Sequence, residues 1–244
     1  MEVHAHTHTP RKKWTHYLWE FLMLFLAVFC GFLAENQREH MVEHNREQNF
    51  IHSLIQDLKT DTANLQLYMD VRNRKHQLLD SLILLLSTDL HKTDGDDTYY
   101  FARQIFNGNR FVNTDGTIQQ LKNGGNLRMI KNEKSAAAIL AYYAAVKMLE
   151  EWDETDSRVR ITFREMGGQI YNSNIFYHLM DSNMNFLRPS NNPQLITEDL
   201  SVINNVTFQI QYLSTITRGN FLRAQYVKET AVQLIDILKK EYHL

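Results

Sequence analysis

Histidine and acidic residues at short spacings are the features of this 244-residue sequence that could bind a metal ion. His40 and His44 stand four residues apart, with Glu43 and Glu47 beside them. Two histidines at that spacing share one face of a helix, an arrangement that zinc and di-iron sites use. The sequence has neither His-Glu-x-x-His nor Glu-x-x-His to complete such a set. We therefore expect surface histidines here and no metal site.

Three other stretches suggest a ligand but lack the pattern that the ligand needs. Alternating histidines in residues 4–8 could chelate a metal weakly, but the polar tail that carries them is expected to be disordered. The acidic run Asp94-Gly95-Asp96-Asp97 lacks the EF-hand spacing, so we expect a solvated turn. Gly124-Gly125 lacks the preceding strand and the Gly-Lys-Ser/Thr signature of a phosphate loop, so we expect a turn between two helices.

Composition and motifs argue against catalysis and against nucleic-acid binding. No Gly-x-Ser-x-Gly nucleophile motif occurs. The net charge of −2 is unlike the basic charge of nucleic-acid-binding domains. Cys30 is the single cysteine, which excludes disulfides within the chain and cysteine-based metal sites. With only 9 glycines and 3 prolines, the composition predicts an all-α protein. We expect no catalytic residue and no cofactor.

Residues 14–36 are the stretch that must position everything after them. The fourteen residues from Phe21 to Ala34 carry no charge, and from Tyr17 to Ala34 only Glu20 is charged. A helix over residues 17–34 would span roughly 27 Å, close to the hydrocarbon thickness of a bilayer. Glu20 falls near the headgroups, where a charge costs less than at the bilayer centre. The pattern predicts a transmembrane signal anchor.

The charges and aromatic residues around this span predict its orientation. Basic residues are denser before the span than after it, with Arg11, Lys12 and Lys13 on one side and Arg38 and Arg46 on the other. Amphipathic aromatic residues that suit a membrane interface stand at the start of the span: Trp14, Tyr17 and Trp19. These features favour a cytoplasmic N-terminus. Phe29 and Phe32 occupy positions where signal-peptide cleavage needs small residues, so we expect the span to be retained.

On a helical wheel the span has two different faces. One face holds the small or acidic residues Glu20, Ala27, Gly31 and Ala34, and the opposite face holds Phe21, Phe25, Phe29 and Phe32. Ala27-x-x-x-Gly31 is a small-xxx-small pair, which lets two helix backbones approach closely. We expect this face to contact another membrane helix, with Glu20 bonded across the contact. The alternative is a lone span whose Glu20 reaches up to the interface.

After the span the sequence predicts a polar helical stalk over residues 37–49 and an antiparallel helical-bundle domain over residues 50–244, behind a disordered tail of residues 1–13. The apolar steps of three and four that mark a bundle seam recur through the domain. Helices are predicted over 50–87, 98–106, 114–123, 132–151, 155–180 and 197 to the end. Asn132 and Thr197 are the expected N-caps, and Gly219 is expected to bend the last helix. That helix should lie antiparallel to the one over 50–86.

Several blocks resemble one family of bacterial single-span membrane proteins. They are the basic N-terminus, the span from Trp19-Glu20 to Ala34-Glu35, the segment Glu47–Leu58, and the segment Leu121–Asn132 followed by Ala141-Tyr142-Tyr143. The family is known as a domain of unknown function, so the resemblance implies an architecture and no activity. Together with the cytoplasmic N-terminus that the charges favour, the span predicts a single-pass protein of the bacterial inner membrane with its C-terminal domain in the periplasm.

Three functions remain open at this point, of which an envelope hydrolase is the least favoured because no nucleophile motif supports it. In the first, the protein is a membrane-anchored helical bundle that binds itself or another membrane protein without catalysis, and its remaining partner is the lipid bilayer. In the second, several copies form an ion- or proton-conducting assembly around Glu20, because acidic residues within spans often mark such paths. A pore lined otherwise by Ala27, Gly31 and Ala34 would be narrow, which favours the first function.

Overall fold

A computed structural model describes residues 14–88, 93–123 and 126–244. These residues form six α-helices and one 3-10 helix: α1 Trp14–Ser87, α2 Gly95–Gln104, α3 Gly116–Asn123, η2 Asn126–Met129, α4 Glu133–Gly167, α5 Ser173–Tyr177 and α6 Leu200–Tyr242. An isolated β-bridge joins Met180 to Phe186, and the described residues contain no strand. The predicted all-α fold is confirmed.

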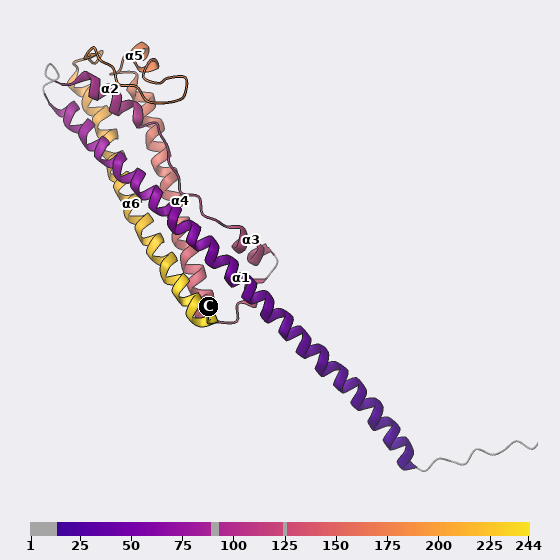
Figure 1. Cartoon of the computed structure of the whole chain (residues 1–244). Helices are drawn as coiled ribbons and strands as arrows, with labels where there is room; N and C mark the ends of the chain where they lie inside the picture. Colours follow the sequence, from indigo (N-terminus) through magenta and orange to yellow (C-terminus); the bar gives the residue numbers. More distant parts are fainter. Residues whose placement is uncertain (1–13, 89–92, 124–125) are drawn as a thin grey trace, which may run out of the picture. The chain divides into compact units, whose positions relative to one another are not determined.

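The chain divides into two compact units, Met1–Phe50 and Ile51–Leu244. In the first unit the structure describes only helix, the part of α1 from Trp14 to Phe50 (Figure 1). Every side chain from Trp14 to Val42 is exposed. Arg38 pairs with Glu35 one turn earlier, as the sequence predicts for a solvated helix face.

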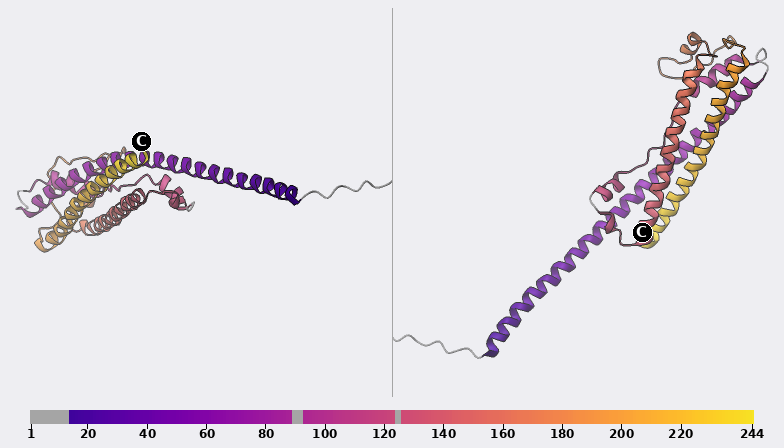
Figure 2. Two further views of the ribbon diagram at one scale, coloured as in Figure 1. Left: turned by 90° about the horizontal axis from the view of Figure 1, so that it is seen from below. Right: turned by 180° about the vertical axis from the view of Figure 1, so that it is seen from behind.

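The second unit is built on three long helices that lie side by side: residues 51–87 of α1, α4 and α6 (Figures 1 and 2). Lys228 of α6 donates to Gln66 and Ser214 contacts His76, so α6 runs antiparallel to α1. The predicted antiparallel pairing of the first and last helices is confirmed. Helix α4 runs parallel to α1, because contacts near its start and middle meet α1 in the same order.

The parallel arrangement of α1 and α4 explains the long connection between them. A chain that leaves the end of α1 must travel back along the bundle before α4 can begin in the same direction. It does so through α2, an extended segment over residues 107–115, α3 and η2 (Figure 1). Asp94 caps α2 and Asn132 caps α4, each accepting a backbone N–H with its side chain. The predicted cap at Asn132 is confirmed.

The core follows the seam that the apolar spacing predicts. Fully buried side chains on α1 recur at steps of three, four, seven and fourteen, which keep them on one side of the helix: Leu54, Leu58, Leu65, Leu79 and Leu82. On α4 the matching set is Ile139, Tyr142, Leu149 and Phe163, and on α6 it is Val206, Ile210, Leu213, Ala224 and Leu238. Side chains on such a seam meet across the bundle because residues three and four apart share one helix face.

Several predicted boundaries are wrong. The two helices expected over 132–151 and 155–180 are one helix, α4, which ends at Gly167. The run Asp94–Asp97 is not an open turn, since α2 begins at Gly95. Asp199, not Thr197, caps α6. Helix α6 runs unbroken through Gly219, and the bend expected there stays a prediction.

Candidate functional site

The structure places the predicted contact face on the exposed surface of the first unit. Glu20, Ala27, Gly31 and Ala34 all lie on α1 with exposed side chains. Glu20 Oε1 is 3.3 Å from His16 Nε2, one turn earlier. Trp14, Tyr17 and Trp19, which the sequence predicts to lie at the membrane interface, are exposed on the same helix. The other predicted interfacial residues, Arg11, Lys12 and Lys13, lie outside the described residues. Whether this face meets another helix stays a prediction.

The phenylalanine face of the span forms a stack along the helix. The ring centroids of Phe21 and Phe25 are 6.3 Å apart, and those of Phe25 and Phe29 are 5.9 Å apart. Among the described helices, only α1 is long and apolar enough to cross a membrane, and none of its apolar window is buried. Apolar side chains on this scale are costly to hold in water. The exposed helix therefore suits lipid or another helix as its surroundings.

The histidine pair predicted to lie on the surface does so. His40 and His44 are exposed on α1, with Glu43 completing the order His-x-x-Glu-His. That order occurs in some zinc enzymes, which need a further acidic ligand from elsewhere. Within residues 14–88, 93–123 and 126–244, no group of three or more histidine, cysteine or acidic side chains lies close enough to hold a metal.

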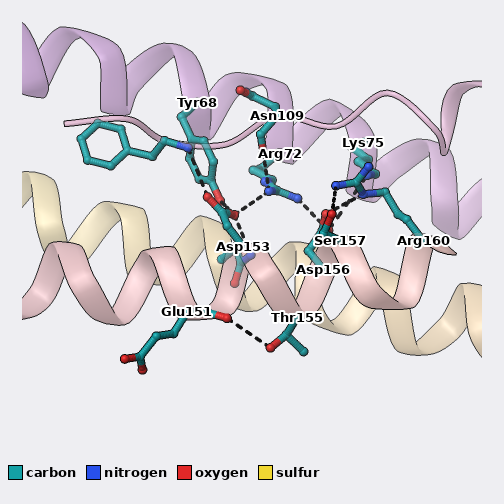
Figure 3. Close-up of polar contacts among 12 residues, drawn as sticks. Tyr68, Arg72, Lys75, Asn109, Glu151, Asp153, Thr155, Asp156, Ser157 and Arg160 are labelled. Atoms are coloured by element: carbon teal, nitrogen blue, oxygen red, sulfur yellow. Dashed lines mark hydrogen bonds and ion pairs between the residues drawn. The ribbon is translucent and has the colours of Figure 1, made fainter. Parts of the chain in front are cut away.

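The middle of the bundle holds a buried ionic cluster, centred on Arg72 of α1 with Asp153 and Asp156 of α4 (Figure 3). Arg72 Nη2 donates to Asp153 Oδ1 over 2.6 Å. The same oxygen accepts from Tyr68 Oη at 2.5 Å and Asn220 Nδ2 at 3.1 Å. Asp153 is therefore tied to both α1 and α6, and it is 2% exposed.

Three cations face the second carboxylate of the buried ionic cluster. Asp156 accepts from Arg72 Nη1 and from Arg160 Nε, each at 2.8 Å, and Lys75 Nζ lies 4.0 Å away. Burial acts to raise the pKa of Asp156, but the charges of Lys75, Arg72 and Arg160 outweigh it and lower the pKa. Burial beside two other cations lowers the pKa of Lys75 to about 7.

The buried ionic cluster also holds the extended connection against the bundle. Arg72 Nη2 donates to the carbonyl of Asn109, and the N–H of Phe111 donates to Asp153 Oδ2 (Figure 3). The buried ionic cluster therefore joins α1, α4 and α6 to the extended connection through hydrogen bonds to one arginine and one carboxylate. Sequence reasoning missed it. The available signal was that Asp153 and Asp156 continue the apolar seam of α4 at steps of three and four.

A serine, a histidine and an aspartate meet on the surface between α1 and α6. Ser214 Oγ is 2.8 Å from His76 Nδ1 and donates to Asp80 Oδ1 over 2.7 Å. His76 Nε2 is 3.5 Å from Asp80 Oδ2. In a nucleophilic triad the carboxylate orients the histidine and leaves the serine proton to the imidazole. Here one carboxylate contacts both partners, so the arrangement favours a polar link between two helices.

A hollow of about 540 Å³ lies at the end of the bundle formed by α2, α5 and the C-terminal end of α4. Its walls are mostly aromatic, from Phe106, Phe163, Tyr171, Phe176 and Tyr177. This volume falls within the range of small-molecule sites, roughly 300–1,000 Å³. Sequence reasoning missed the hollow, because residues 103–106 and 163–177 are far apart in the chain and only the fold brings them together.

Comparisons of the chain with models of protein families, with curated proteins and with solved structures found no match. The resemblance to a bacterial single-span family therefore stays a prediction.

Proposed function

We propose that this chain is a membrane-anchored helical-bundle protein of the bacterial inner membrane that acts without catalysis, by binding a partner protein or further copies of itself. The observation that carries the proposal is the helix over residues 14–36, whose side chains are all exposed and largely apolar. Burial of apolar surface is the main gain available to such a helix, and lipid and a second membrane helix are the surroundings that provide it.

The contact face on α1 indicates where a second membrane helix would bind. Ala27, Gly31 and Ala34 present almost no side chain, so a second helix backbone could approach closely at this face. A Cβ added at Gly31 would meet nothing within 4 Å in the isolated chain. A large residue at this position therefore leaves the monomer unstrained and obstructs only a contact with another molecule.

The test is the size of the full-length protein, purified in a mild detergent and measured by light scattering after size exclusion. We expect an oligomer, or a complex with a copurifying membrane protein, that Gly31→Leu dissociates. Phe29→Leu, on the opposite face of the helix, is the matched control and should leave the assembly intact. A monomer without partners before and after the Gly31 substitution would contradict the proposal.

The anchor itself has a separate test. The protein should sediment with membranes on lysis without detergent and return to solution only when detergent is added. The mature chain should also retain residues 14–36, as N-terminal sequencing would show. Recovery in the supernatant, or a mature chain that begins after Ala34, would overturn the anchoring.

The contact between Glu20 and His16 favours a second candidate function, an oligomeric ion or proton path. Two titratable side chains 3.3 Å apart at one end of an apolar helix could pass a proton between them. Reconstituted protein should then conduct protons, and Glu20→Gln should abolish the current. Conductance that the substitution leaves unchanged would exclude this candidate.

A further inference from the structure

The hollow at the end of the bundle has an aromatic wall built from three elements. Phe106 follows α2, Phe163 lies on α4, and Phe176 lies on α5. The ring of Phe106 is 5.6 Å from that of Phe163 and 5.9 Å from that of Phe176, so the three form one continuous surface. Tyr177, which is 77% exposed, stands at the rim. Such a wall suits the apolar body of a small ligand.

Two arginines line the same hollow without a carboxylate partner. Within the described residues, no aspartate or glutamate oxygen lies within 4 Å of Arg103 or Arg164, although Arg72, Arg160 and Arg188 each pair with one. Arg103 lies over the ring of Phe176, with its Cζ 5.2 Å from the centroid. Its Nε is buried and has no hydrogen-bond partner in the described part of the chain. An unpaired buried donor of this kind needs an explanation, and an acceptor supplied by a ligand in the hollow would provide one.

Two glycines that the backbone does not require complete the lining. Gly168, the C-cap that follows α4, has φ −63°, a helical conformation that any residue can adopt. A Cβ added there would meet nothing within 4 Å, and one added at Gly167 would only touch Tyr171 at 3.8 Å. Neither a left-handed turn nor close packing therefore explains the pair. Because both glycines line the hollow and lack side chains, they leave space open in it.

We propose that this hollow binds a small organic anion, a carboxylate that carries an aromatic ring or a short alkyl chain. Arg103 and Arg164 receive the carboxylate through charge-assisted hydrogen bonds. The rings of Phe106, Phe163 and Phe176 cover the apolar body, and the two glycines leave room for it. The site lies wholly within the second unit, so it is independent of the membrane contact proposed for the first.

The experiment uses full-length protein in lipid nanodiscs, with para-fluorophenylacetate as the probe and fluorine NMR as the readout. We expect saturable binding above that of empty nanodiscs. Unlabelled phenylacetate should displace the probe. Acetate, which lacks the ring, and phenethylamine, which reverses the charge, should not. The binding should weaken as salt is added, because part of it is electrostatic.

Substitutions assign the binding to the hollow. Arg103→Gln and Arg164→Gln should each lower the association constant about tenfold, as expected for the loss of a charged hydrogen bond. Gly168→Leu should fill the hollow and abolish binding. The matched control is Arg158→Gln, because Arg158 is exposed on α4, does not line the hollow, and its guanidinium donates to Thr155 within the same helix.

Three results would overturn the proposal. They are no saturable binding above empty nanodiscs, displacement by phenethylamine as strong as by phenylacetate, or an Arg158→Gln variant that weakens binding as much as Arg103→Gln. Circular dichroism checks that each variant is folded. If Arg103→Gln fails this check, the exposed Arg164 and the unconstrained Gly168 still decide the outcome. None of these results bears on the membrane anchor.

Discussion

Arg72 and Asp153 form an ion pair of 2.6 Å in which the side chains are only 1% and 2% exposed. Neither charge can be hydrated, so each depends on its protein partners to offset the cost of leaving water. The pair joins α1 to α4, and Asn220 of α6 donates to the same carboxylate. One carboxylate oxygen thus links all three long helices of the bundle.

Arg72→Met should therefore be strongly destabilising. The substitution leaves Asp153 and Asp156 as buried charges without their main partner, and breaking a buried pair in this way costs about 3–5 kcal/mol. Urea unfolding of the full-length protein in mild detergent, followed by circular dichroism, measures the free energy of unfolding. Arg74→Met, at an exposed position on the same helix, should change it by less than about 0.5 kcal/mol. Equal losses of unfolding free energy in the two variants would contradict this stabilising role of Arg72.

Lys75 should make stability depend on pH. Its pKa is about 7 in the folded protein, and the ordinary value of 10.5 applies when the chain unfolds. Between these values the unfolded state binds one more proton, so the free energy of unfolding should rise as pH increases from 7 to 9. The rise from this one group cannot exceed about 1.4 kcal/mol per pH unit.

Urea titrations at pH 7, 8 and 9 would measure this rise. Lys75→Met removes the titrating amine and should flatten the profile over that interval. It should also raise stability at pH 7, where the folded protein tolerates the charged amine poorly. A profile that is equally steep in the variant would assign the dependence to another group.

The sequence predicts local features of the bundle, such as caps and some helix ends, better than it predicts which helices are continuous. The end of α1 at Ser87 and the cap at Asn132 follow from local signals that no tertiary contact opposes. Asp153 looks like a helix breaker in the sequence, because aspartate favours caps and turns. In the structure Arg72 and Tyr68 satisfy its side chain, so α4 continues through it. A contact with a residue 81 positions away overrides the local preference.

The contact face of α1 and the hollow at the end of the bundle also differ in how well the sequence could predict them. The face of Glu20, Ala27, Gly31 and Ala34 is a property of one helix, so spacing alone could place its residues together. The hollow near Arg103 combines that arginine with residues of α4 and α5, which lie more than 50 positions later. Helical periodicity says which face of an element is apolar. It does not say which arginine of one element meets which aromatic residue of another.

Tyr142 should stabilise the bundle through a single hydrogen bond. Its hydroxyl donates to Asp61 Oδ2 over 2.5 Å, and Asp61 is fully buried. Tyr142→Phe leaves that carboxylate with hydrogen bonds from Thr114, through its backbone N–H and its side chain, and should cost about 1–3 kcal/mol in urea unfolding. The adjacent Tyr143 is the control, since its hydroxyl is buried without a hydrogen-bond partner in the described part of the chain.

Tyr143→Phe should be neutral or slightly stabilising, because it removes a buried polar group that gains nothing from folding. The cost of Tyr142→Phe should also depend on pH. Burial raises the pKa of Asp61, and the hydroxyl of Tyr142 opposes that rise, so the variant should raise the pKa further. Its deficit should therefore shrink as pH falls and Asp61 becomes neutral in both proteins. A deficit that grows on acidification would show that the hydroxyl acts through another group.

Gly95, the first residue of α2, should tolerate no side chain. A Cβ at this position would overlap the carbonyl of Pro193, and the N–H of Gly95 already donates to Asn192 Oδ1 over 2.7 Å. Gly95→Ala must therefore push the start of α2 away from this loop, which should cost about 1–3 kcal/mol, as for an overpacked core.

Gly116 begins α3 in open space, with nothing within 4 Å of an added Cβ. Gly116→Ala should be neutral or stabilise by about 0.4–1 kcal/mol, because it restricts the unfolded chain. Thermal unfolding of the two variants distinguishes close backbone approach at Gly95 from a general preference for glycine at helix starts. Equal changes in stability for both variants would exclude the close approach as the reason for Gly95.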